Sequence, residues 1–336
     1  MRADRILLAH GSGGTMMREL IEECIVPDFD DDALKRLDDA ASLDMPAGRV
    51  AFSTDTYVVN PIFFPGGDIG RLAVCGTVND VATSGATPLY LSVGFVLEEG
   101  FPIEDLRKVM LSMKDAAREA GVHIVTGDTK VVEKGHGDGI FINTAGIGHL
   151  AEGVDLSGSY VRPGDKILLS GTLGDHGIAI VSTREGLEFE TSIETDAAPL
   201  NKLIANVLAA APGTRCFRDP TRGGLASTLN EIADASKVSI TVTETAVPVK
   251  PQVRGASEML GYDVFQVANE GKMVAIVPAE QADAALAAMK ASPYGEDAAI
   301  IGEAGDGRAG KVYVYTSFGA TRIMDMLVGE QLPRIC

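Results

Sequence analysis

Apolar residues recur along the first half of the chain at two spacings, which predict alternating strands and helices. Runs rich in β-branched and apolar residues are typical of strands, and apolar positions three and four residues apart indicate helices. Strands are predicted at residues 49–59, 89–97, 122–126 and 140–147, and helices at residues 16–24, 70–84 and 102–120. Since strands and helices alternate, we expect an α/β (α+β) fold.

The second half repeats this mixture after a turn-rich stretch at residues 161–165. Strands are predicted at residues 166–170, 238–243, 263–268 and 273–277, and helices at residues 199–210, 223–235, 251–260 and 280–289. Residues 299–301 and 312–316 are predicted to close as a hairpin. We therefore expect domains at residues 1–155 and 156–320, followed by a mobile C-terminal tail at residues 321–336.

The connection between the last two predicted strands imitates a phosphate-binding loop. It reads Gly305-Asp306-Gly307-Arg308-Ala309-Gly310-Lys311. In a true phosphate loop the lysine is followed by Ser or Thr, and the loop leads from a strand into a helix. Here Val312 follows and the segment joins two strands, so we interpret it as a turn.

Composition narrows the functional classes. The chain has 336 residues, a formal net charge of −18, 5% aromatic residues and no Trp. Its charge disfavours nucleic acid and anionic membranes, and it lacks the aromatic residues on which bases stack. We expect neither a signal sequence nor a membrane span, because residues 6–9 form too short an apolar run.

The four cysteines show no CxxC pairing and no zinc-ligand spacing. A chain of this length does not need a disulfide framework, so we expect a reducing, cytoplasmic setting. Cys24 and Cys75 lie in apolar surroundings and are predicted to be core residues.

Three aspartates, Asp55, Asp80 and Asp128, fall at predicted element ends among Ser, Thr, Asn or Gly. Magnesium bound to a nucleotide uses only a few carboxylates, because phosphates and waters complete its octahedron. The pattern favours a metal–nucleotide site. The alternative is that each is an ordinary surface acid of a chain with charge −18. Sequence does not show whether they converge.

A glycine-rich stretch, Gly11-Ser12-Gly13-Gly14, leads into the first predicted helix. Backbone N–H groups of such a turn bind anions well. A flexible turn explains the motif equally well.

The chain ends in Leu332-Pro333-Arg334-Ile335-Cys336. Pro333 pushes its predecessor toward extended geometry, so we expect an extended arm. In such an arm alternate side chains share a face, which would place Arg334 beside Cys336 and favour the thiolate. The alternative is a disordered terminus without function.

In order along the chain, these motifs resemble the ATP-using family of aminoimidazole ribonucleotide synthetase and selenophosphate synthetase. The resemblance covers nearly the whole chain. Further markers are similar to the carbamoyl dehydratases of hydrogenase maturation. They are Phe63-Phe64-Pro65-Gly66-Gly67, Gly127-Asp128-Thr129-Lys130, Ser170-Gly171-Thr172-Leu173-Gly174-Asp175-His176-Gly177, Asp219-Pro220-Thr221-Arg222-Gly223-Gly224, Asn269-Glu270-Gly271-Lys272 and Pro333-Arg334-Ile335-Cys336.

The resemblance implies a two-domain fold of this family and a homodimer whose N-terminal domains pair into a barrel. It implies that a carbamoyltransferase loads Cys336 and that ATP drives dehydration of the thiocarbamate to a thiocyanate. The cyanide would then pass to iron on a hydrogenase maturation scaffold complex, as a ligand for NiFe hydrogenase.

The resemblance also assigns residues. Asp55, Asp80 and Asp128 are expected to hold magnesium and ATP, together with Asn79 and the loop from Gly11 to Gly14. Lys130 and Glu270 are candidates for charge stabilisation and proton removal near the thiocarbamate; the alternatives are a surface lysine and a capping acid. His176 and Arg222 are weaker candidates, each equally compatible with a structural role.

The tail has the reach for two positions. Ten extended residues span at most about 33–36 Å, so the stretch from about Leu327 could swing Cys336 between an internal ATP site and an external partner. We expect ATP to favour the inward state. Two other functions fit the sequence: a synthetase or kinase acting on a free small molecule, and a carrier whose thiol only ferries a group.

Overall fold

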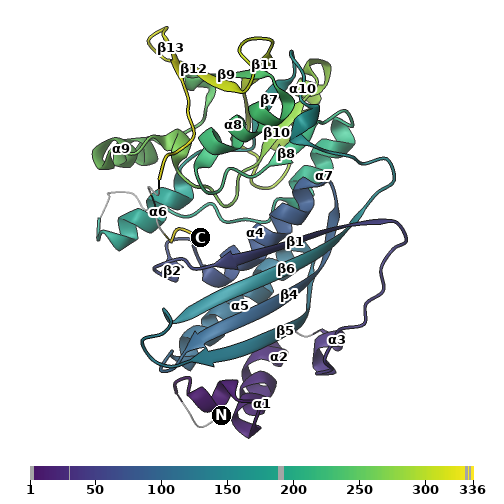
Figure 1. The fold of residues 1–336 in the computed structure, drawn as a ribbon, viewed down its shortest axis with the longest axis vertical. Helices are drawn as coiled ribbons and strands as arrows, with labels where there is room; N and C mark the ends of the chain where they lie inside the picture. The colour runs from purple at the N-terminus through teal and green to yellow at the C-terminus, as the bar shows by residue number, and fades with distance from the viewer. Residues whose placement is uncertain (1–3, 30, 188–192, 330–331, 333) are drawn as a thin grey trace.

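The computed structural model describes residues 4–29, 31–187, 193–329, 332 and 334–336. Two mixed α/β layers lie one above the other, and the last residue lies between them (Figure 1). The N-terminal layer is built on a four-stranded sheet and the C-terminal layer on a seven-stranded sheet. None of the described helices is long and apolar enough to cross a bilayer.

The N-terminal sheet has the order β1-β6-β4-β5. Its strands are β1 (Arg49–Tyr57), β4 (Thr87–Glu98), β5 (His123–Val132) and β6 (Ile140–Leu150). Strand β4 pairs parallel with β5, and the other pairs are antiparallel. All four predicted strands are confirmed. However, Asp55 and Asp128 lie inside strands, not at their ends, because β1 and β5 run on past them.

Helices α4 (Ile69–Thr83) and α5 (Ile103–Ala120) cover one face of this sheet (Figure 1). The α5 helix buries one stripe, including Leu106, Val109, Met113 and Ala117, at the predicted helical spacing. Gly121 ends it in a left-handed conformation that glycine adopts without strain. The α4 helix is buried on nearly all sides, and Asp68 caps its first turn.

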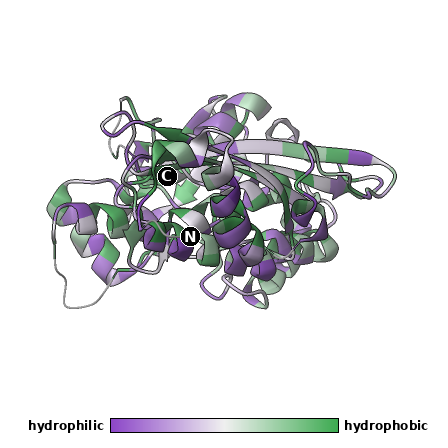
Figure 2. Ribbon diagram, turned by 90° about the horizontal axis from the view of Figure 1, so that it is seen from below, coloured by the Kyte–Doolittle hydropathy of each residue, from purple (hydrophilic) through white to green (hydrophobic). Residues whose placement is uncertain are grey.

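The opposite sheet face is more open, with Val50 54% and Phe52 68% exposed. Short helices lie beyond the far edge of the sheet, and a small hairpin lies near the domain boundary. These elements are α1 (Thr15–Leu20), a π-helical turn (Ile21–Ile25), α2 (Val26–Phe29), α3 (Asp32–Lys35), β2 (Phe63–Phe64) and β3 (Gly67–Asp68). Figure 2 shows hydrophobic and hydrophilic residues mixed along the outer helices.

The C-terminal sheet has the order β13-β12-β9-β11-β7-β10-β8. Its strands are β7 (Lys166–Leu169), β8 (Cys216–Arg218), β9 (Ser239–Thr243), β10 (Val274–Val277), β11 (Ala299–Gly305), β12 (Lys311–Tyr315) and β13 (Thr321–Ile323). Its helices are α6 (Asp175–Arg184), α7 (Asn201–Ala210), α8 (Gly224–Ser236), α9 (Pro251–Leu260) and α10 (Ala282–Lys290).

Two predictions for this half are wrong. Strand β9 lies between β11 and β12, so these do not form a hairpin. Residues 263–268 contain a 3-10 turn, Val264–Gln266, because the Asp263 side chain accepts from the Phe265 N–H and closes a turn. The mobile tail at residues 321–336 stays a prediction; its first residues, 321–323, pair with the sheet as β13, and the N–H of the buried Met324 donates to the Val312 carbonyl.

Candidate active site

The chemistry-bearing side chains meet between the two domains. Asp55 comes from β1 and Asp80 from the last turn of α4, while Asp219 follows β8 and Glu270 precedes β10. Cys336 reaches the same place from the tail. The thiol hydrogen-bonds to Glu270 and lies within the electrostatic influence of Asp55.

Glu270 is a buried carboxyl group and not a surface cap. Its side chain is 4% exposed, and Oε1 has no hydrogen-bond partner among the described residues. Burial raises the pKa of Glu270 well above its usual range, and the charges of Asp219, Asp196 and Asp55 raise it further. A buried carboxyl group with a free oxygen beside a thiol is suited to exchange protons with whatever the sulfur carries.

The pKa values of two neighbouring aspartates, Asp219 and Asp80, are raised as well. Burial, and then the charge of Asp80, raise the pKa of Asp219 from 3.8 to about 7. Burial also raises the pKa of Asp80; Ser53, which donates to it at 2.8 Å, opposes the shift, and Asp55 adds to it. The carboxyl groups of this site outnumber the positively charged side chains near them. A bound cation would therefore be favoured there.

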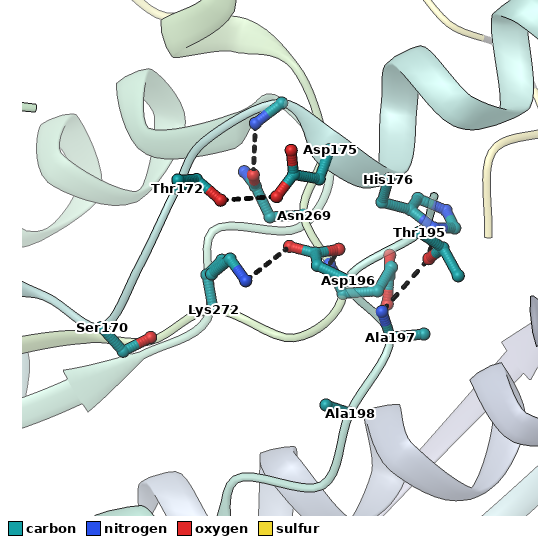
Figure 3. A network of polar contacts seen from close by, with 12 residues as sticks. Ser170, Thr172, Asp175, His176, Thr195, Asp196, Ala197, Ala198, Asn269 and Lys272 are labelled. Atoms are coloured by element: carbon teal, nitrogen blue, oxygen red, sulfur yellow. Dashed lines mark hydrogen bonds and ion pairs between the residues drawn. The ribbon is translucent and has the colours of Figure 1, made fainter. Parts of the chain in front are cut away.

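A network of polar contacts fixes the Glu270 loop (Figure 3). The Glu270 N–H donates to Asp196 Oδ1 at 3.0 Å, and Lys272 Nζ lies 3.7 Å from Asp196 Oδ2. Asn269 is fully buried; its Oδ1 accepts from the Gly174 N–H at 2.7 Å, and its Nδ2 donates to the Pro220 carbonyl at 3.0 Å. The loop is therefore held on both sides, which orients Glu270.

Gly271→Ala should damage this site. A Cβ at Gly271 would overlap the main-chain oxygen of Asp196, so one of the two segments must move. We expect the melting temperature to fall by several degrees, as a loss of about 2 kcal/mol gives at this size, and the dehydration activity proposed below to fall with it. Calorimetry and an activity assay on the same preparation measure both effects.

Gly255→Ala is the matched control. Gly255 lies inside α9, where an added Cβ meets nothing within 4 Å. Replacing glycine inside a helix by alanine stabilises by about 0.5–1 kcal/mol, so this variant should melt slightly higher. If both variants melt alike, the close approach at Gly271 has no energetic consequence.

The tail conformation corrects the prediction for Arg334. This residue has a φ of 54°, so the chain turns there and is not fully extended. The Arg334 guanidinium pairs with Asp138 and donates to the Val58 carbonyl at 3.2 Å, away from the thiol. Arg222 is the cation that acts on Cys336. The prediction for Pro333 lies outside the described residues.

Docked in this way, Cys336 is an unreactive thiol. Burial raises the pKa of Cys336 well above its usual range and Glu270 adds to the shift, while the Arg222 guanidinium opposes it. Since the thiolate is the nucleophile, the raised pKa makes the unmodified sulfur of the half-buried Cys336 a weaker nucleophile in this position.

The glycine-rich loop and Asp128 lie elsewhere. Gly14 caps α1, and Gly13 has a φ of 79°. Both line a cavity of about 710 Å³ with Asp128, between the N-terminal helices and the β5 edge. Gly11 lies in a 3-10 turn against Val131, and Ser12 donates to the Ala9 carbonyl at 3.0 Å.

Strand register separates Asp128 from Asp55. Asp128 lies opposite Gly94 in β4, which lies opposite Asn143 in β6, which lies opposite Thr56 in β1. Successive side chains point to opposite faces, so Asp55 and Asp128 face opposite sides of the sheet. One chain does not bring the three predicted ligands together; their shared role remains a prediction.

Lys130 is also remote from the thiol. It follows Asp128 on the same face of β5, pairs with it, and its side chain is 60% exposed. A single chain therefore places only Glu270, of the two proton-transfer candidates, beside Cys336.

Asn79 joins the domains. Its side chain is buried, its Nδ2 donates to the Ala198 carbonyl at 3.0 Å and its Oδ1 accepts from the Leu200 N–H at 2.7 Å. These contacts disfavour the predicted contact with a nucleotide. His176, on the first turn of α6, contacts the tail: its Nε2 lies 2.8 Å from the Ile335 carbonyl oxygen.

Sequence reasoning assigned no role to Asp219, although its motif was noted. The residue follows the apolar pair Cys216-Phe217 and precedes a Pro-Thr-Arg-Gly-Gly turn. An acid near the end of a predicted apolar strand is the same pattern that indicated Asp55. Asp196 carries no local signal, because its importance comes from contacts across the fold with Glu270 and Lys272.

The acids do not form a closed metal site on their own. Among the described residues, no group of three His, Cys, Asp or Glu side chains is arranged to hold a metal ion. The fit to a cation rests on the excess negative charge and on the free oxygen of Glu270.

Known protein families match both halves of the chain. The AIR synthase related protein families match residues 37–150 (N-terminal domain) and 162–315 (C-terminal domain). Carbamoyl dehydratase HypE of Cupriavidus necator is 55% identical and covers 100% of this chain and 96% of its own length. A solved HypE in complex with ATP has a TM-score of 0.95 at 51% identity, over 98% of this chain and 99% of that one.

A HypE–HypF complex also matches, with a TM-score of 0.81 at 50% identity, over 92% of this chain and 99% of that one. Family models that span most of the chain and identities above 50% over its full length point the same way. The chain belongs to the HypE family of carbamoyl dehydratases, within the AIR synthase related proteins.

Proposed function

We propose that this protein dehydrates a carbamoyl group carried on its own Cys336, with ATP as the second substrate, and so supplies the cyanide ligand of the iron in NiFe hydrogenase. The observation that carries the proposal is the position of the sulfur: it lies beside a buried, partly unpartnered carboxyl group at the junction of the domains. A free small-molecule substrate would not require a docked tail, and a carrier would not require a buried acid.

The reaction balances as follows. The carboxamide oxygen of the S-carbamoyl group attacks the γ-phosphorus of ATP, and ADP leaves. Two N–H protons are removed, the C–O bond breaks and phosphate departs, which leaves a thiocyanate on the sulfur. Phosphorylation is needed because water is a poor leaving group. Glu270 in its ionised form would remove a proton from the nitrogen, and its raised pKa makes that carboxylate a stronger base.

The high pKa of the docked thiol places loading outside this site. An unmodified Cys336 is protonated here and is a poor nucleophile. We infer that the carbamoyltransferase loads the sulfur while the tail is undocked, and that the loaded tail then returns. The solved HypE–HypF complex supports HypF as this partner, and the solved HypE–ATP complex supports ATP binding.

Magnesium, when bound with ATP, would neutralise charge on the transferred phosphoryl group. Asp55, Asp80 and Asp219 are the residues of this chain that would share in holding it, with ATP phosphates and waters completing the coordination, because each carries carboxylate oxygens in a surplus of negative charge.

Asp219→Asn tests this assignment. Removing one of several mutually repelling buried acids should raise the melting temperature of the nucleotide-free protein or leave it unchanged. The further rise that Mg-ATP gives to the unaltered protein should be lost, since stabilisation by a ligand follows its affinity. Thermal shift with ATP alone, Mg²⁺ alone and both together measures this. Asp234→Asn, an exposed change on α8, should keep the full Mg-ATP shift.

We also propose a homodimer formed through the open face of the N-terminal sheet. Val50 and Phe52 are exposed there, and exposed apolar side chains on one sheet face favour burial by a partner. An iron-carrying maturation scaffold complex is the proposed acceptor of the cyanide, and the cytoplasm the proposed location.

Intact-mass spectrometry tests the reaction itself. After incubation with the carbamoyltransferase, carbamoyl phosphate and ATP, the peptide that carries Cys336 should first gain a carbamoyl mass and then lose water. If Cys336 gains the carbamoyl group and never loses water, the protein is a carrier and the proposed dehydration is refuted.

A further inference from the structure

The rest of the chain holds the end of the tail chiefly by its main chain. Residues 58–60, His176 and Arg184 form a surface that we call the tail dock. The carbonyl of Arg334 accepts from the Asn60 N–H at 3.2 Å and from Arg184 Nη2 at 2.9 Å. The carbonyl of Cys336 accepts from the Val58 N–H at 3.2 Å. Residues 58 and 60 thus pair with 336 and 334 in antiparallel sense, as when a peptide extends a sheet edge.

The Ile335 carbonyl is held by His176, whose role is fixed by its partners. A carbonyl oxygen only accepts, so Nε2 of His176 carries the proton and donates at 2.8 Å. Nδ1 is therefore the acceptor, and the Thr195 hydroxyl donates a hydrogen bond to it at 2.7 Å. The imidazole is buried and packs edge-on against Phe64, with ring centres 5.7 Å apart. Two contacts that do not involve the tail, with Thr195 and Phe64, hold this imidazole in place.

Ile335 is the most deeply buried side chain among the described residues of the tail end, and the guanidinium of the preceding Arg334 pairs with Asp138. Ile335 is 3% exposed and packs into the N-terminal core. Leu332 is partly buried against the same core. Of the described residues between Met324 and Leu332, Val328 is 97% exposed. The contacts that hold the tail end in place involve residues 332 and 334–336.

We propose that the tail dock is a peptide-binding site, and that the protein acts in trans on S-carbamoylated peptides ending in Ile-Cys, including the tail of a second copy. The inference rests on the proposed function and extends it to a substrate class. Main-chain and side-chain donors bind the main-chain oxygens of the last three residues. The Ile335 pocket gives selectivity for an apolar residue before the cysteine, and Glu270 acts on whichever sulfur is presented.

In the unaltered chain the tethered tail outcompetes a free peptide, because a short link gives an effective concentration on the order of mM. The experiment therefore uses the full chain with Ile335→Asp and Cys336→Ala, whose own tail has lost its apolar anchor. The probe is an N-acetylated Leu-Pro-Arg-Ile-Cys peptide, S-carbamoylated with cyanate, in the presence of Mg-ATP. Loss of water from the peptide is followed by mass spectrometry, and peptide binding by fluorescence anisotropy with a labelled copy.

We expect the double variant to dehydrate the peptide, and a peptide with Asp in place of Ile to react at least about 10-fold more slowly, the loss expected from an unfilled apolar pocket. His176→Gln in the same background should weaken peptide binding at least about 5-fold, through one lost or misplaced hydrogen bond. His149→Gln, remote from the dock, should bind as before. Circular dichroism and melting confirm that each variant is folded.

A cis control separates the two ideas. The unaltered chain, S-carbamoylated at Cys336, should lose water with Mg-ATP. If it does while the folded double variant neither binds nor dehydrates the peptide, the peptide-site inference is overturned and the proposed function stands. If neither reaction occurs, the proposed function fails as well.

Discussion

Replacing Cys336 by alanine should abolish thiocyanate formation completely while leaving the folded body intact. The sulfur is the atom on which the proposed carbamoyl group is carried, whereas the dock holds the tail by the main-chain carbonyls of residues 334–336. We therefore expect no carbamoyl gain and no loss of water at the tail in intact-mass spectra. The melting temperature should change by less than about 2 °C, as expected for a largely main-chain contact.

A second cysteine provides the control. Cys24 is 2% exposed in the N-terminal core, so Cys24→Ala should lower stability and still allow loading and dehydration of Cys336. Cyanide supply to a hydrogenase precursor at the normal rate by the Cys336→Ala protein would refute the proposed function.

Glu270→Gln should lower the dehydration rate by about 10²-fold or more, the usual contribution of a positioned general base. The amide keeps the shape of the side chain and cannot accept a proton. Loading should continue, because it takes place with the tail undocked. Mass spectra should therefore show the carbamoylated tail accumulating without loss of water, in single-turnover experiments with saturating Mg-ATP.

Glu280→Gln, an exposed change in the 3-10 turn before α10, should react normally and serves as the control. If the Glu270→Gln protein dehydrates its tail at an unchanged rate, the base lies elsewhere. The next candidate is then Lys130, supplied from outside the single chain, since within one chain it lies on the opposite sheet face.

Much of the fold could be predicted because local pattern determines element type. The α5 helix follows from its apolar spacing and Gly121, and β1, β4, β5 and β6 follow from their composition. The partners of each strand could not be predicted. Alternation of apolar and polar residues indicates that residues 312–316 form a strand, but it does not indicate that β9 lies between that strand and β11. Residues 263–268 also resemble a strand in composition. The 3-10 turn there depends on the side-chain contact of Asp263 with the Phe265 N–H, which composition does not indicate.

The site was predictable in part for the same reason. Local motifs identified Glu270, Asp55, Asp80 and Cys336, which the fold does bring together. They also grouped Asp128 with Asp55, because sequence gives the alternation within a strand but not the order of strands, and the two face opposite sides of the sheet. The turn at Arg334 was missed because its cause, the pairing with Asp138 and with residue 60, comes from distant parts of the chain.

The dock is assembled from residues 58–60, His176 and Arg184, all of which leave the ribosome well before residue 335 does. The groups that hold the tail are therefore made before the residues that they bind. The order of synthesis thus provides a period in which one molecule can hold the end of another.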